Sequence, residues 1–306
     1  MTTTRRLIPF AFALLTLFGG CARMPSTGLT TLRPANMAEL QNHLRTHKAD
    51  VDLFRLRGPF DVNIRKDYEL HLSGTEVIKA DLFLSSPAEK APLVILLHGL
   101  DNSKENHGYQ GIHLATWGIH CLVLQLPNQG PWDTNGKTVA RIATLIYRQP
   151  EIIDSRIDAS KIILAGHSYG GAAMAIALAE GAPVAGGILL DPAGTDRSLP
   201  NYLRRVNKPV MMVGADERVS RVRDRGYFYQ FIRSGIAEVS IRDAAHEDAT
   251  YPFELDSSTT EELQITFVSA LTSATFSLAY TGKLDYAWAS FRDGMENGKL
   301  VKAKKK

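Results

Sequence analysis

Short apolar runs alternate with stretches of helical spacing from Leu93 onward, and this alternation limits the folds open to the chain. Runs without polar residues suit strands buried on both faces, so the pattern predicts a mostly parallel sheet with helices on both sides, an α/β fold. Val139, Ile142 and Ile146 recur at helical spacing, which gives one helix an apolar face. The predicted strands are 93–97, 120–126, 161–165, 187–190, 210–213 and 238–241, and the predicted helices include 108–117, 137–148 and 171–180.

The flanking segments have different patterns. Residues 51–57, 67–73 and 76–84 have strand character, and Gly74-Thr75 between the last two predicts a hairpin. A helical region follows Glu261. We therefore expect one α/β domain over 51–295, and we expect residues 296–306, which are rich in lysine, to form a solvated basic tail.

The composition excludes several classes of protein. At 306 residues, 44% hydrophobic and 22% charged, the chain fits one large globular domain with short ends. This composition argues against a disordered chain and against a polytopic membrane protein. The formal net charge of +3 comes from Arg5, Arg6 and the closing lysines. No basic stripe with interleaved aromatic residues occurs elsewhere, which argues against a nucleic-acid partner.

The N-terminus has the layout of an export signal. Arg5-Arg6 precedes an apolar run, 7–18, which is too short to span a bilayer, and Gly19-Gly20-Cys21 follows. This stretch resembles a bacterial lipobox, which implies a signal peptide over 1–20, lipidation of Cys21 and a place in the bacterial cell envelope, on the periplasmic side or the outer membrane. An uncleaved anchor or a plain secretory signal is the alternative. Residues 21–50 then read as a tether with a short helix after Asn36.

The strongest chemical signal is Gly166-His167-Ser168-Tyr169-Gly170. This G-x-S-x-G motif falls between a predicted strand and a predicted helix, the context of a nucleophile elbow, so Ser168 is the candidate nucleophile. The alternative is a tight turn whose serine has no catalytic role. We expect His167 to be a packed structural residue, because a triad histidine in this context comes last in the chain.

A serine nucleophile needs a histidine to take its proton and a carboxylate to orient that histidine. His246 is the only histidine after Ser168 and follows the last predicted strand, so it is the candidate base. Cys121 lies in an apolar run and is interpreted as a buried hydrophobic residue rather than a nucleophile.

The identity of the acid is open between two strand ends. Asp191 follows the strand 187–190, whereas Asp216 and Glu217 follow the strand 210–213. Both places lie at the carboxyl edge of a parallel sheet, where such a group must project. The alternatives are a capped turn at Asp191 and a solvated charge cluster at Asp216 and Glu217.

Backbone N–H groups must stabilise the oxyanion that forms when serine attacks. We expect one from Tyr169, directly after the nucleophile, and one from Leu100 in the loop that follows the strand 93–97. His98 is expected to support that loop. Trp132 follows another strand at the same edge and is a candidate wall for the substrate, or a tryptophan that covers the helix below it.

On these motifs the chain resembles the α/β-hydrolases, and within them the platelet-activating-factor acetylhydrolase and chlorophyllase group. The resemblance covers about residues 60–255 and is carried by five segments. They are Leu97-His98-Gly99-Leu100, Leu114-Ala115-Thr116-Trp117-Gly118, Gly166-His167-Ser168-Tyr169-Gly170-Gly171, Leu189-Leu190-Asp191-Pro192-Ala193-Gly194 and Ala245-His246. The group has its acid after the earlier strand, which favours Asp191, whereas cutinases have it after the next strand, as Asp216 or Glu217 would be here.

The resemblance implies an exported serine hydrolase that cleaves carboxylic esters through an acyl-enzyme. Short connections at 127–138 and 191–208 leave no room for a cap domain, so we expect an open site. No metal or cofactor is implied, and the partners are an ester substrate and a membrane. A peptidase or thioesterase, or a non-catalytic binding lipoprotein, is the alternative.

Overall fold

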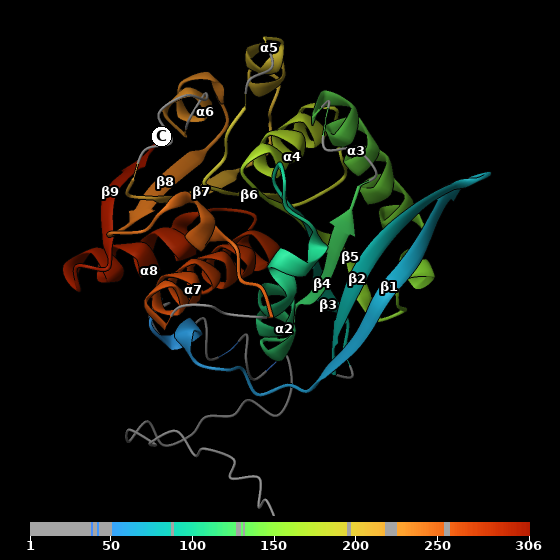
Figure 1. Ribbon diagram of the computed structural model, residues 1–306, viewed down its shortest axis with the longest axis horizontal. Coiled ribbons are helices and arrows are strands. Elements are labelled where there is room, and N and C mark those ends of the chain that lie inside the picture. The colour runs from blue at the N-terminus through green and yellow to red at the C-terminus, as the bar shows by residue number, and fades with distance from the viewer. Residues whose placement is uncertain are drawn as a thin grey trace, which may run out of the picture. The chain divides into compact units, whose positions relative to one another are not determined.

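The computed structural model describes most of the chain from residue 51 onward (Figure 1). The predicted signal peptide, Cys21 and the capping residue Asn36 lie outside the described residues. The described residues are 38, 42, 51–86, 89–126, 130, 132–194, 197–217, 225–253 and 258–306. They belong to one compact unit, Arg33–Lys306.

The described strands form one sheet in the order β1-β2-β4-β3-β5-β6-β7-β8-β9. Strands β3 to β8 pair in parallel, and the pairings β1–β2, β2–β4 and β8–β9 at the two ends are antiparallel. The mostly parallel sheet predicted from the apolar runs is confirmed. The strands are β1 (Val62–Ser73), β2 (Glu76–Ser85), β3 (Ala91–Leu97), β4 (His120–Gln125), β5 (Ile157–His167), β6 (Gly186–Leu190), β7 (Val210–Ala215), β8 (Ile236–Ile241) and β9 (Leu300–Lys305).

Helices cover both faces of this sheet (Figure 1). The α-helices are α2 (Gly108–Thr116), α3 (Trp132–Arg148), α4 (Tyr169–Ala179), α5 (Leu199–Leu203), α6 (Arg225–Phe231), α7 (Ser258–Thr281) and α8 (Asp285–Glu296). The 3-10 helices are η1 (Leu53–Arg55), η2 (Lys104–His107), η3 (Pro150–Ile152) and η4 (His246–Ala249). The helix described between β6 and β7 is the short α5, which agrees with the expected lack of a cap at that connection.

Two hydrophobic cores explain why the central strands read as unbroken apolar runs. In β3, Val94 and Leu96 face the core shared with α2, α7 and α8, whereas Leu93 and Ile95 face the core shared with α3, α4 and α6. All of these strand residues are fully buried. A strand covered on both faces needs apolar side chains at every position, because successive side chains point to opposite sides.

Helix α7 lies inside the domain. Its segment Glu261–Thr281 is long and apolar enough to cross a membrane, but 83% of its most apolar window is buried within the fold. Buried hydroxyl groups such as those of Thr272 and Thr275 donate to the carbonyl four residues earlier, at 2.7 and 2.8 Å. The helix therefore serves as a core element of the domain.

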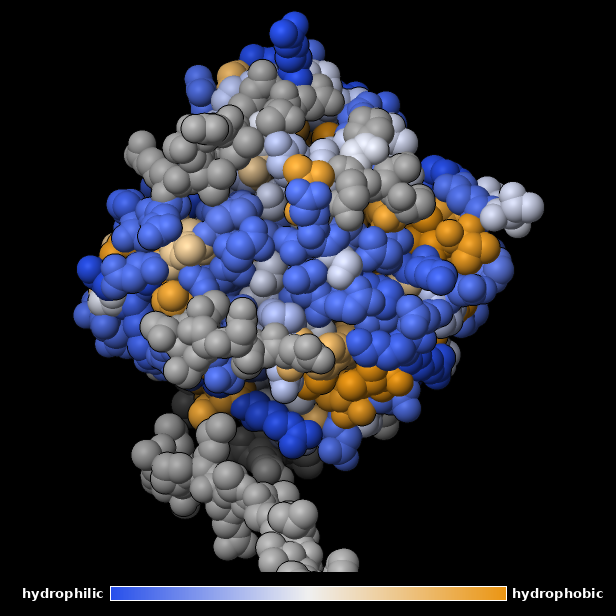
Figure 2. All heavy atoms as spheres, viewed as in Figure 1, coloured by the Kyte–Doolittle hydropathy of each residue, from blue (hydrophilic) through white to orange (hydrophobic). Residues whose placement is uncertain are grey.

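The predicted hairpin is confirmed as β1 and β2, and it lies at one edge of the sheet (Figure 1). Figure 2 shows a mainly hydrophilic face on which apolar areas follow this hairpin. Ile64 and Val77, one on each strand, have exposed fractions of 42% and 37%. Single exposed apolar side chains such as these are ordinary on the surface of a folded protein.

Two predictions at the ends of the domain are wrong. Residues 51–57 contain the 3-10 helix η1 (Leu53–Arg55) instead of a strand, because Phe54 packs its ring 5.0 Å from that of Trp117 and 5.5 Å from that of Phe276. The basic tail is not solvated coil: Leu300–Lys305 forms β9 on the edge of β8. Lys304 of β9 binds Glu238 of β8 at 2.9 Å, so the lysines there neutralise carboxylates.

Candidate active site

Ser168 occupies a sharp turn between β5 and α4. Its φ of 53° and ψ of −124° are strained for a residue with a side chain. The turn lies close to the next loop, because a Cβ added at Gly170 would lie 2.4 Å from the carbonyl oxygens of Leu97 and His98. The strand, strained serine and helix predicted from the motif are therefore present.

His246 connects Ser168 to Asp191. Its Nε2 lies 2.9 Å from Oγ of Ser168, and its Nδ1 lies 2.6 Å from Oδ2 of Asp191. These partners assign the neutral tautomer in which Nδ1–H donates to the carboxylate and Nε2 accepts the serine proton. The serine and the carboxylate are buried, and the histidine side chain is 21% exposed. The arrangement can deliver a proton from the serine hydroxyl to the imidazole.

Asp191 follows β6 directly and is fixed on several sides. Its φ is 39°, and its N–H donates to the carbonyl of Val213 at 2.8 Å. Oδ1 accepts a hydrogen bond from the N–H of Ala215 at 3.1 Å and lies 3.1 Å from Nε of Arg225. Oδ2 is left to face His246.

The other two candidate carboxylates have different partners. Asp216 forms an ion pair with Lys302, and the hydrogen bond from this lysine lowers the pKa of the carboxyl. Glu217 donates its backbone N–H to the carbonyl of Ala244 at 3.1 Å. Of the three candidates, Asp191 is the carboxylate that the structure places against His246.

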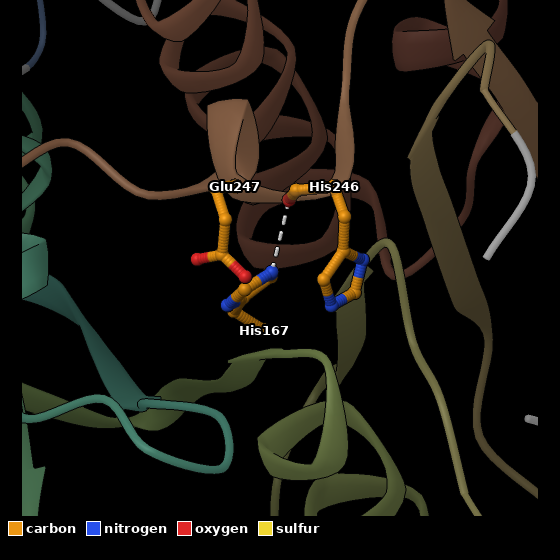
Figure 3. A group of neighbouring side chains, drawn as sticks. All are labelled: His167, His246 and Glu247. Carbon is orange, nitrogen blue, oxygen red and sulfur yellow. Dashed lines mark hydrogen bonds between the residues drawn. The ribbon is translucent and has the colours of Figure 1, made fainter.

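His167 supports the loop that holds His246. Its Nε2–H donates to the backbone carbonyl of His246 at 3.1 Å, and the two rings lie 4.6 Å apart (Figure 3). His167 is fully buried, and burial together with the nearby His246 holds its pKa well below the usual value. The ring is therefore a neutral donor, in agreement with the expected structural role.

His167, His246 and Glu247 are close enough together to be considered as metal ligands. Figure 3 shows them side by side, and their possible ligand atoms lie within 4.8 Å of one another. However, Nε2 of His167 and both nitrogens of His246 have hydrogen-bond partners, and Glu247 accepts a hydrogen bond from Asn102 at 3.3 Å. A cation bound by all three residues would have to displace at least one hydrogen bond of His246.

The loop after β3 crosses next to the nucleophile. A Cβ added at Gly99 would lie 2.8 Å from Cβ of Ser168, so only a glycine allows this approach. Leu100 follows it, 41% exposed, and Tyr169 is the first residue of α4 on the other side of the serine. His98 is buried and donates from Nδ1 to the carbonyl of Gly99 at 2.8 Å, which supports the loop as expected.

Trp132 and Cys121 occupy different environments. The Trp132 ring stacks on that of Tyr169 at 5.5 Å and 28°, which places it beside the residue after the nucleophile. Cys121 is fully buried in β4, and burial raises the pKa of its thiol. A thiol in such a place is not a nucleophile, as the sequence indicated.

Arg225 is the residue at this site that sequence reasoning missed. It begins α6 and contacts Asp191 from the side opposite to His246. No motif or spacing marks it, because it reaches the carboxylate through tertiary structure alone.

Comparison with known protein families matches residues 94–294 to the alpha/beta hydrolase family. No curated protein matches the chain in a comparison of sequences. The match covers more than half of the chain, includes Ser168, Asp191 and His246, and agrees with the parallel sheet that these residues follow. The chain therefore belongs to the alpha/beta hydrolase family.

Proposed function

We propose that this hydrolase cleaves carboxylic esters through an acyl-enzyme formed on Ser168. The observation that carries the proposal is the relay in which His246 lies 2.9 Å from Oγ of Ser168 and 2.6 Å from Asp191. A serine hydroxyl is a weak nucleophile unless a base removes its proton, and an imidazole held by a carboxylate is such a base.

In the first half of the reaction, Oγ of Ser168 attacks the ester carbonyl while its proton moves to Nε2 of His246. The charge that develops on the carbonyl oxygen is stabilised by the N–H groups of Leu100 and Tyr169, each worth roughly 10²- to 10³-fold in rate. Asp191 stabilises the imidazolium through Nδ1. The C–O bond then breaks, and His246 gives its proton to the departing alcohol oxygen.

In the second half, water attacks the acyl-enzyme. His246 takes one proton from the water, the new C–O bond forms, and the bond to Oγ of Ser168 breaks. His246 returns its proton to Oγ, so a carboxylic acid leaves and the enzyme is restored. Every proton step uses the same nitrogen, Nε2, which the hydrogen bond from Nδ1 to Asp191 keeps aimed at the serine.

The position of the acid favours the platelet-activating-factor acetylhydrolase and chlorophyllase group as the relatives of this chain. Asp191 follows β6, whereas Asp216, after β7, pairs with Lys302. The Trp132–Tyr169 stack beside the nucleophile offers a flat apolar wall for the acyl or alcohol part of the ester.

The site of action that we propose is the bacterial cell envelope, with the domain held on a membrane through acylated Cys21. The sequence 17–21, Leu-Phe-Gly-Gly-Cys, supports this anchor. Several acyl chains on one cysteine, at about 0.8 kcal/mol per buried methylene, give durable attachment.

Fluorophosphonate labelling tests the nucleophile, and a chain-length series of p-nitrophenyl esters tests the substrate class. We expect one labelled serine in the wild type and none in Ser168→Ala, with turnover of the esters lost in the same variant. Thioester and p-nitroanilide substrates with the same acyl groups are the rival substrates, and they test the alternative thioesterase and peptidase activities. Faster turnover of either rival would replace the ester assignment, and unlabelled wild-type protein would refute the serine mechanism and favour a binding lipoprotein.

A further inference from the structure

The Asp191 carboxylate has a cationic partner on the side away from His246. Nε of Arg225 lies 3.1 Å from Oδ1 of Asp191, and the two side chains are 11% and 6% exposed. An ion pair this deeply buried is poorly screened by water. It therefore restrains the orientation of the carboxylate more strongly than a surface ion pair would.

The guanidinium joins three neighbouring strands at their carboxyl ends. Besides Asp191 after β6, it reaches the carbonyl of Ala215 in β7 from Nη2 at 2.5 Å and Oγ of Ser240 in β8 from Nη1 at 2.8 Å. A planar group with N–H donors in fixed directions can meet all three partners at once, and a lysine ammonium on its flexible chain cannot reproduce that fork.

Gly214 provides the space that the guanidinium fills. A Cβ added at this position would lie 1.9 Å from Nη1 and 2.2 Å from Cζ of Arg225. Gly214 belongs to β7 and would otherwise be an ordinary strand position. The absence of a side chain there allows the arginine to lie across the strand and reach the acid.

A second buried carboxylate lies on the far side of the guanidinium. Oε1 of Glu238 is 3.8 Å from Nη1 of Arg225, and Oε2 is 2.9 Å from Nζ of Lys304 in the C-terminal strand. Asp191, Arg225, Glu238 and Lys304 thus alternate in charge. A cavity of about 270 Å³ adjoins them and is also lined by Asp216 and Lys302.

We propose that Arg225 is a positioning residue of the hydrolase, which holds the Asp191 carboxylate so that Oδ2 faces Nδ1 of His246. The proposal rests on the function proposed above. Oδ1 receives Nε of Arg225 and the N–H of Ala215, which fixes rotation of the carboxyl group about its Cβ–Cγ bond. Without the arginine, the carboxylate can turn, and its hydrogen bond to His246 loses alignment.

The first test compares Arg225→Met with Arg205→Met. Arg205 forms a 2.7 Å ion pair with Glu180 at the surface and serves as the matched control. For Arg225→Met we expect kcat and the rate of fluorophosphonate labelling to fall roughly 10- to 100-fold, the value of one charge-assisted hydrogen bond. KM should stay within about twofold, because Arg225 acts through Asp191 and not on the substrate. The control should keep wild-type kinetics.

The second test asks whether the effect passes through Asp191. In an Asp191→Asn background, Arg225→Met should cause little further loss of kcat, whereas independent effects would multiply. Arg225→Met leaves the buried Glu238 carboxylate without its guanidinium partner, which could destabilise the fold. The cycle is therefore repeated with Glu238→Gln in every variant, so that no variant has an unpaired charge at position 238. Millimolar ethylguanidinium should restore part of kcat to Arg225→Ala through the adjoining cavity.

Three results would overturn the proposal. If the wild type hydrolyses esters while Arg225→Met and Arg205→Met behave alike, Arg225 has no positioning role and the proposed function stands. If the losses of kcat multiply in the double variant, Arg225 acts independently of Asp191, and its effect would be assigned to the general stability of the fold. If the wild type neither hydrolyses esters nor reacts with the phosphonate, the proposed function fails and this role fails with it.

Discussion

His167 donates its Nε2 proton to the backbone carbonyl of His246, so the residue before the nucleophile holds the residue that would activate it. The bond joins the end of β5 to the start of η4. The segments that carry Ser168 and His246 are therefore joined by the bond from the His167 ring to the His246 carbonyl as well as by the hydrogen bond between Ser168 and His246.

His167→Leu should lower kcat for esters about tenfold, because one hydrogen bond that orients the η4 loop is lost and a buried carbonyl is left unpaired. His167→Gln keeps an N–H donor of similar reach and should retain most of the activity. Steady-state kinetics on p-nitrophenyl esters measures both. Equal activities in the leucine and glutamine variants would show that the donor is irrelevant.

Asp191→Asn and Asp216→Asn form a matched pair that tests the acid. The first should reduce kcat by roughly 10⁴-fold, because an amide favours the wrong tautomer of His246. The second removes a partly exposed ion pair with Lys302 and should leave kcat close to wild type. The acid would move to the later strand if the losses occurred in the opposite order, or if Glu217→Gln alone abolished turnover.

The parts of the site that could be predicted are those that depend on local sequence. Ser168 lies in a short motif whose strand and helix have clear patterns, and His246 is the only histidine after it. Arg225 gave no signal, because its contact with Asp191 depends on how α6 packs and on the missing side chain at Gly214.

The wrong predictions also have physical causes. The closing lysines read as a solvated tail, but strand pairing is made by backbone groups, and Leu300 and Ala303 supply apolar contacts of β9 with the core. Its lysines meet carboxylates that lie far away in the sequence, such as Glu238. At 51–57, one buried aromatic ring, that of Phe54, outweighs strand propensity.

Buried histidines predict acid sensitivity of the fold. Burial lowers the pKa of His107, His113 and His120 from 6.5 to about 4. Between about pH 4 and 6.5 these histidines are therefore protonated in the unfolded chain but neutral in the folded chain. This contribution to stability is fully present above about pH 6.5 and is lost as the pH falls to 4, at roughly 3 kcal/mol per histidine.

Thermal unfolding at pH 7, 6, 5 and 4 measures this loss. We expect the melting temperature to fall throughout this range, before paired carboxylates such as Asp154 contribute, since the hydrogen bond from Arg156 lowers the pKa of Asp154 to about 2. His113→Phe should flatten the dependence by one proton. A melting temperature that is constant from pH 7 to 5 would mean that these histidines are accessible to protons in the folded state.

Cys21→Ser tests the membrane anchor. Full-length wild-type protein expressed in a bacterium should sediment with the envelope fraction and incorporate labelled fatty acid, because several acyl chains bind a bilayer durably. The serine variant should lose both properties. Wild-type protein that stays in the soluble fraction would instead indicate a plain secretory signal.

Lys104 neutralises a carboxylate that has no access to water. Its Nζ lies 2.8 Å from Oδ1 of Asp81 in β2, whose side chain is fully buried, and the lysine side chain is only 5% exposed. Lys66 binds the same carboxylate at 3.0 Å, but its own side chain is 44% exposed. Burial by itself would lower the pKa of Lys104, but the hydrogen bonds to carboxylates outweigh it and raise that pKa.

Lys104→Met should therefore lower the free energy of unfolding by about 3 kcal/mol, since among the described residues it leaves Asp81 with Lys66 as its remaining cation. Arg141→Met is the matched control: Arg141 pairs with Glu76 at 2.7 Å on the surface, where an ion pair contributes no more than about 1 kcal/mol. Urea unfolding measures both. Because Lys104 begins η2, which follows the loop beside Ser168, its loss should also reduce ester turnover, whereas the control should not. Equal unfolding free energies in the two variants would show that water reaches Asp81.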